Sequence, residues 1–158
     1  IQMAGEGSER RSLERWITDG GTPDWASLEA PRQAFLRTPS LYGRARIVVL
    51  PCIGACAGDN AVPVALEAMA SGRLVVAAAV GALKEIIQNG KTGILAPPED
   101  PEALANALAE GLNMNRKAYA HITRAARLEM AARYGIPQYG QRLVDSLYAC
   151  WIEKTLSG

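Results

Sequence analysis

Hydrophobic residues along the chain gather in short unbroken runs, and these runs are separated by segments with helical periodicity. The runs cover residues 46–50, 74–79 and 94–96, and a shorter one ends at Met3-Ala4. None of them alternates with polar residues, which favours parallel strands covered on both faces. Strands that alternate with helical segments predict an α/β fold, a Rossmann-like parallel sheet with helices on both faces.

Helix start signals are clearest after the third strand. Asp100 followed by Pro101 predicts an N-cap with proline at the first helical position, and Ser8 is a candidate N-cap for an earlier helix. Two more helices are expected over residues 116–132 and from about residue 137. The apolar positions predicted to face the core are Leu13, Trp16 and Ile17 in the first helix, and Leu104, Leu108 and Leu112 after Pro101.

Length and composition limit what the chain does. Its 158 residues suit one domain, with a sheet core at residues 1–110 and a helical tail at 111–158. A net charge of +1 gives no electrostatic case for nucleic acid or an anionic membrane. The apolar run at residues 74–80 is far too short for a transmembrane segment. Three cysteines and one histidine provide no four-ligand metal set and no disulfide scaffold, so we expect no metal and a cytoplasmic location.

The most informative segment is residues 62–70, which is apolar except for Glu67. A helix that is apolar all round is typical of a buried helix, and a buried carboxylate must find polar partners. Two interpretations stay open. Glu67 is either a structural carboxylate that bonds to loop amides, or it accepts hydrogen bonds from the hydroxyls of a bound ligand.

Three glycine-containing loops follow predicted strands, at residues 5–7, 51–61 and 80–82. Ligands of open α/β sheets bind outside the carboxyl ends of the strands, and glycines such as Gly5, Gly7 and Gly81 let backbone amides approach a ligand closely. Glu85, in the short helix after Gly81, is either an acid that favours the helix dipole or a second ligand contact. The loops support the ligand-binding interpretation of Glu67.

Several stretches resemble a known family. Residues 66–77 resemble the segment LEAMA-x-G-x-PVVA of the GT4-type retaining glycosyltransferases of GT-B fold. Residues 81–95 are similar to the GG-x-x-E-I-I-x-x-G-x-x-G-x-L of that family, and residues 100–105 match its D-P-E-A-L-A. Order and spacing hold from residue 1 to about residue 110. The resemblance implies the C-terminal, donor-binding half of a GT-B enzyme.

The resemblance also implies roles for individual residues. Glu67 would hold the ribose hydroxyls of a nucleotide-diphosphate sugar, the donor substrate, with no separate cofactor. Backbone amides around Ala61 and Val62, helped by the Gly5 and Gly81 loops, would meet the pyrophosphate. The family has an acid eight positions before this glutamate that touches the sugar, so strict spacing assigns Asp59. A one-residue deletion would assign Asn60 instead.

Two departures from the family bear on activity. An Arg and a Lys that clamp the pyrophosphate in the family lie before the residue at which this sequence begins, and so does the acceptor-binding N-terminal domain. We therefore expect these 158 residues alone to be inactive, with a glycan or lipid acceptor and any peripheral membrane contact belonging to the missing domain. Two alternatives remain, a non-catalytic glycosyltransferase-like interaction module and a fragment of a sugar-nucleotide epimerase.

Overall fold

The computed structural model describes residues 1–4, 7–19, 27–29, 40–54 and 57–156. They belong to two compact units, Ile1–Arg44 and Ala45–Gly158, each of which is described by itself. The first unit pairs β1 (Gln2–Ala4) with β2 (Ser27–Glu29) in parallel, and α1 (Arg10–Thr18) lies between them in the chain. The strand predicted to end at Met3-Ala4 is therefore present.

The second unit is built on a three-stranded parallel sheet in the order β3-β4-β5, with β3 at Ile47–Leu50, β4 at Leu74–Ala78 and β5 at Ile94–Ala96. All five residues of the central strand β4 are buried. This confirms the three predicted strands. The unbroken apolar runs mark strands covered on both faces, as expected for a parallel sheet.

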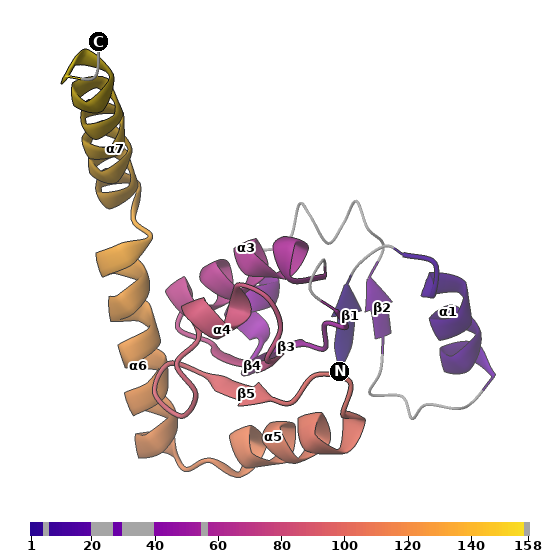
Figure 1. Cartoon of the computed structure of the whole chain (residues 1–158). Coiled ribbons are helices and arrows are strands. Elements are labelled where there is room, and N and C mark those ends of the chain that lie inside the picture. Colours follow the sequence, from indigo (N-terminus) through magenta and orange to yellow (C-terminus); the bar gives the residue numbers. More distant parts are fainter. Residues whose placement is uncertain (5–6, 20–26, 30–39, 55–56, 157–158) are drawn as a thin grey trace. The chain divides into compact units, whose positions relative to one another are not determined.

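Helices cover both faces of this sheet (Figure 1). α3 (Ala57–Ala70) and the short α4 (Leu83–Ile86) lie on one side, and α5 (Pro101–Asn113) lies on the other, against β4 and β5. α6 (Arg116–Arg133) packs against α3, and α7 (Ile136–Leu156) follows it. The predicted α/β class and the helices after residue 111 are both confirmed.

α5 begins as the sequence predicts, and small residues form the centre of its buried face. Asp100 is the N-cap, and its Oδ1 accepts a hydrogen bond of 2.8 Å from the backbone N–H of Ala103. The buried residues are the small Ala107 and Gly111, whereas Leu112, predicted to face the core, is 57% exposed. Small residues allow α5 to approach the sheet closely. Leu104 packs against the core as predicted and Leu108 is half-buried, so the prediction fails at Leu112.

α1 corrects two expectations. The N-cap is Glu9 rather than Ser8, and it makes no side-chain capping bond. No residue of α1 is buried, and Trp16 is 52% exposed. The spacing of Leu13, Trp16 and Ile17 did predict a helix. Periodicity identifies the apolar side of a helix, however, and not whether another element covers that side.

Candidate functional site

α3, the helix that carries Glu67, packs against α6, α4 and the sheet. Among residues 61–70, whose burial is described, the buried ones are three alanines and one methionine, namely Ala61, Ala65, Ala68 and Met69. Pro63 and Ala70 are exposed. The expectation of a helix buried on every side is therefore wrong. Apart from Glu67, residues 62–70 are uncharged on the covered and on the open side of α3 alike. Composition alone therefore did not separate the two sides.

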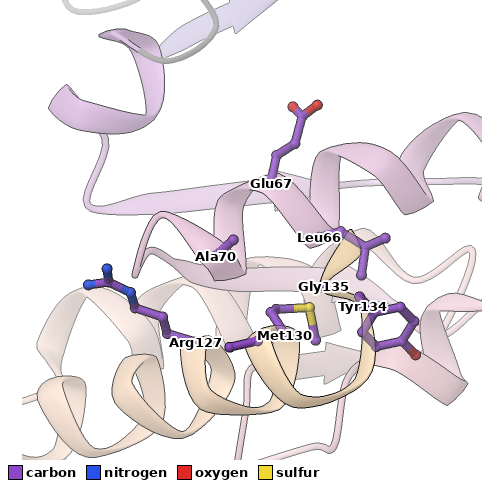
Figure 2. Close-up of a pocket in the computed structure, with 8 residues that line it drawn as sticks. Leu66, Glu67, Ala70, Arg127, Met130, Tyr134 and Gly135 are labelled. Carbon is purple, nitrogen blue, oxygen red and sulfur yellow. The ribbon is translucent and has the colours of Figure 1, made fainter. Parts of the chain in front are cut away.

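Glu67 lies on the open side. Its side chain is exposed, and Figure 2 shows it directed away from the side chains of Leu66 and Tyr134. The desolvation argument for Glu67 consequently fails, because an exposed carboxylate keeps its hydration. Both earlier interpretations assumed burial. What the structure shows instead is a carboxylate on the exposed side of α3, three residues before the helix ends at Ala70.

A cavity of about 380 Å³ is lined by residues of α3 and α6. Arg127 and Glu67 are its charged lining residues, although the Glu67 carboxylate points away from the others (Figure 2), and Met130 of α6 is a buried member of the lining. The full lining is Leu66, Glu67, Ala70, Arg127, Met130, Ala131, Tyr134 and Gly135 (Figure 2). Sequence reasoning missed the α6 residues, because no local pattern shows that a segment about 60 residues away packs against α3.

The start of α3 changes the assignment of backbone amides. The helix begins at Ala57, whereas the sequence predicted a loop up to Asn60. In an α-helix each N–H bonds to the carbonyl four residues earlier, so the amides of Ala61 and Val62 lie within the helix. The amides left for a ligand are those of the first turn, from residue 57 to residue 59. Asp59 and Asn60 both belong to this extended first part of the helix, and only their backbone is described.

Pro63 lies inside α3 and weakens the link between this first turn and the rest of the helix. Proline has no N–H, so the carbonyl of Asp59 lacks its usual partner four residues on. Proline is best tolerated in the first turn of a helix. The sequence therefore favours a start near Val62, and the structure extends the helix by a further turn.

The glycine loops fall in different units. Gly81 follows β4 with φ +46°, a conformation that favours glycine, and it is exposed at the turn into α4, which contacts α3. Gly7 is exposed in the first unit, where its carbonyl accepts a 3.2 Å hydrogen bond from the N–H of Arg10. Gly5 lies outside the described residues. The structure thus groups Gly81 with Glu67 in one unit, and the two N-terminal glycines stay predictions.

The remaining polar candidates have ordinary surroundings. Glu85 is exposed in the first turn of α4, which suits an acid that favours the helix dipole. Burial raises the pKa of the Cys52 thiol, so Cys52 is not an activated nucleophile. Within the described ranges, His, Cys, Asp and Glu form no group of three or more that would hold a metal ion. In the same ranges no helix is long and apolar enough to cross a membrane.

The second unit thus combines a Rossmann-like parallel sheet, covered by helices on both faces, with an exposed acid on α3. A family model described as glycosyl transferases group 1 matches residues 1–114, and the chain belongs to this family. The family predicted from the sequence motifs is thereby confirmed.

Curated relatives are enzymes of similar description. A D-inositol 3-phosphate glycosyltransferase of Corynebacterium urealyticum is 35% identical over 106 residues, which cover 67% of this chain and 24% of the relative. A putative colanic acid biosynthesis glycosyltransferase of Salmonella typhimurium is 33% identical over 105 residues, 65% of this chain and 26% of the relative. The chain thus spans about a quarter of the length of these relatives.

Solved structures share the fold over most of the chain. A glycosyltransferase of Rickettsia africae superposes with a TM-score of 0.76 at 19% identity, over 91% of this chain and 38% of its own. Anabaena HepE, solved in complex with UDP and glucose, gives a TM-score of 0.75 at 22% identity, over 94% of this chain and 40% of its own. At these identities the likeness shows the fold alone, and it confirms the predicted fold class.

Proposed function

We propose that this chain is the donor-binding domain of a retaining glycosyltransferase and that it acts together with a further domain. The matched relatives are about four times longer than the region that they share with this chain. The observation that carries the proposal is the family match over residues 1–114, which includes α3, the turn at Gly81 and the cap of α5. The Anabaena neighbour, solved with UDP and glucose, supports a nucleotide-diphosphate sugar as donor. The acceptor, a glycan or a lipid, would bind the further domain.

Glu67 is proposed to hold the ribose. Its exposure supports this role, because a carboxylate that solvent reaches is also accessible to the hydroxyls of a ligand, and its two oxygens can accept hydrogen bonds from them. Hydrogen bonds to a charged group are each worth about 1.5–3 kcal/mol. The largely apolar cavity between α3 and α6, which Glu67 also lines, would receive less polar parts of a ligand.

Helix geometry bears on the choice between Asp59 and Asn60. At about 100° per residue, position 60 lies within about 20° of Glu67 around the α3 axis, and position 59 about 80° away. Both positions are separated from Glu67 by about 10–12 Å along the axis, at 1.5 Å per residue. This spacing would let two distant groups of one extended donor, the ribose and the sugar, bind along one side of the helix. It favours position 60 for the sugar contact.

The pyrophosphate is proposed to bind at the first turn of α3. The backbone amide of Gly81, in the turn between β4 and α4, is proposed to contribute to the same site. Free N–H groups and the helix dipole make a helix N-terminus a site for phosphate. This moves the predicted amides from Ala61 and Val62 to residues 57–59. The role of Gly5 and Gly7 at the same pyrophosphate stays as the sequence predicted it.

Calorimetry with UDP, GDP and ADP, on the longest natural form of the protein that contains this chain, tests the proposal. One of the three should bind, and Glu67→Gln should weaken that binding by about 10- to 100-fold, the equivalent of one lost charged hydrogen bond. Glu110→Gln, at an exposed acid of α5, is the matched control and should bind as the wild type does. Failure of all three nucleotides to bind, or equal loss in both variants, contradicts the proposed donor site.

A second candidate, a non-catalytic interaction module, is favoured by one observation on α7. This helix exposes large apolar residues along its described length, which are Ile136, Tyr139, Leu143, Val144, Leu147 and Tyr148. Apolar patches of this kind mark interaction surfaces. Sedimentation distinguishes the candidates, because a monomer that binds nucleotide and no protein supports the enzyme, and a stable assembly that binds no nucleotide supports the module.

A further inference from the structure

Charge is segregated between two successive helices of the second unit. From Glu99 to the end of α5 there are four acids and no Lys or Arg. α6 carries five Lys or Arg and one Glu, a formal charge of +4 (5 − 1). The two regions cancel within the net charge of +1, so the composition of the whole chain conceals a strongly basic element.

Four of the five cations of α6 lie on one face, and Arg133 lies on the opposite side of the helix. Its solvent-exposed basic face consists of Arg116, Lys117, His121, Arg124 and Arg127, all of them exposed. At about 100° per residue, these positions lie within about 80° of Arg124 around the helix axis, and they extend over about 17 Å. The acid of α6, Glu129, lies about 140° away and pairs with Arg133 at 2.9 Å. Within the described part of the chain, no acid pairs with a cation of the basic face.

The first two cations of the basic face are unfavourable for the stability of α6. Arg116 and Lys117 occupy the first turn of α6, which contains no acid. Cations there meet the positive end of the helix dipole, which disfavours them. α5 has Glu102 at the corresponding position, as the dipole favours. A local choice that costs stability without a compensating contact is a mark of functional use.

We propose that the basic face of α6 docks on the anionic surface of a lipid bilayer. Charge complementarity requires a partner with many negative charges spread over at least the length of the face. The residues between the cations are aliphatic, Ala120, Leu128 and Ala131, and Leu128 is 61% exposed. Just after α6, Ile136 and Tyr139 are 88% and 65% exposed. Cations mixed with aliphatic and tyrosine side chains suit a membrane interface.

The same residues fit nucleic acid less well. Sequence or strand recognition uses amide and hydroxyl side chains on base edges, or exposed aromatic rings on which bases stack. The basic face has neither, since Tyr119, the aromatic residue of α6, is half-buried and its hydroxyl donates a 2.8 Å hydrogen bond to the carbonyl of Arg46. The inference is tested separately from the donor site, because Arg127 is the one residue of the basic face that lines the cavity between α3 and α6, and the variants below leave Arg127 unchanged.

Cosedimentation with vesicles tests the inference on the full chain. One vesicle is phosphatidylcholine alone, and the other contains about one third phosphatidylglycerol. We expect binding to the anionic vesicle only, lost as salt is raised to several tenths molar because exposed charges are then screened. The double variant Lys117→Glu, Arg124→Glu should bind at least about tenfold more weakly. The double variant Arg11→Glu, Lys91→Glu, at exposed sites elsewhere, makes the same change in net charge and should bind as the wild type does.

Each other outcome counts against the inference. Equal binding to both vesicles would assign the contact to apolar residues, and equal loss in both double variants would assign it to net charge. Failure to bind either vesicle would overturn the membrane inference. If the protein then bound a DNA duplex, the basic face would be a nucleic-acid site instead. The neutral variant Lys117→Gln, Arg124→Gln, checked for helical content by circular dichroism, should also lose binding while it stays folded.

Discussion

α5 and α6 are neighbours in the chain with similar starts and opposite charges. Each has a side-chain N-cap, Asp100 for α5 with a 2.8 Å bond and Asn115 for α6 with a 2.9 Å bond to the N–H of Ala118. α5 then places an acid in its first turn, whereas α6 places two cations there. The family match ends at residue 114, in the turn between them.

The difference indicates that the two helices satisfy different requirements. α5 covers the sheet, follows the local rules of helix stability and lies within the part of the chain that the family model describes. α6 packs against α3, buries Ala126 and Met130, and exposes a basic face whose first-turn cations are unfavourable for its own dipole. The fold therefore depends more on α5, and we expect contact with other molecules to depend more on α6.

The largest expected difference in the free energy of unfolding is between a substitution in the buried contact of α5 and one on the exposed side of α6. A Cβ added at Gly111 would lie 2.9 Å from Leu74 Cδ2 and 3.1 Å from Ile47 Cδ1, both in strands of the sheet. Gly111→Val should therefore lower the free energy of unfolding by about 2–3 kcal/mol through overpacking. Ala120→Val, on the exposed side of α6, should change it by less than about 0.5 kcal/mol. Urea unfolding followed by circular dichroism measures both, and equal losses would show that α5 is not the more tightly packed helix.

The caps should give a smaller difference. Asp100→Ala and Asn115→Ala each remove one capping hydrogen bond, which costs about 1 kcal/mol. Asp100→Ala should cost a few tenths of a kcal/mol more, because it also removes a negative charge from the positive end of α5. Urea unfolding at low ionic strength compares them. If Asn115→Ala were the more destabilising, the stability of the unit would depend on α6 more than the packing suggests.

Local signals in the sequence were enough for the elements of the second unit. The apolar runs fixed β3, β4 and β5, and Asp100-Pro101 fixed the start of α5, because a strand covered on both faces and a capped first turn each have their own sequence pattern. Burial was harder to predict. Leu112 and Trp16 are exposed although they lie on apolar stripes, since a stripe says nothing about the element that covers it.

For the site, the sequence identified Glu67 through an argument that the structure does not support. The carboxylate is exposed rather than buried, so its significance now depends on the family match and on the neighbouring cavity. Arg127 and Met130 were not predicted as cavity residues, because the α3–α6 contact joins distant segments of the chain. The basic face was hidden as well, since the acids around α5 cancel it in the total charge.

Reversing one charge in the first turn of each helix makes the sharpest test of the comparison. Glu102 and Lys117 hold the same place, the second residue of α5 and of α6. Reversing each charge should act in opposite directions: Glu102→Lys should lower the free energy of unfolding by about 0.5–1 kcal/mol, and Lys117→Glu should raise it by a similar amount at low salt. Lys117→Glu should at the same time weaken binding to anionic vesicles, whereas Glu102→Lys should not weaken it. If Lys117→Glu is more stable and binds anionic vesicles less well, Lys117 contributes to membrane binding and destabilises α6. If Lys117→Glu were destabilising, its cation would already have a use within the fold, and the comparison between α5 and α6 would fail.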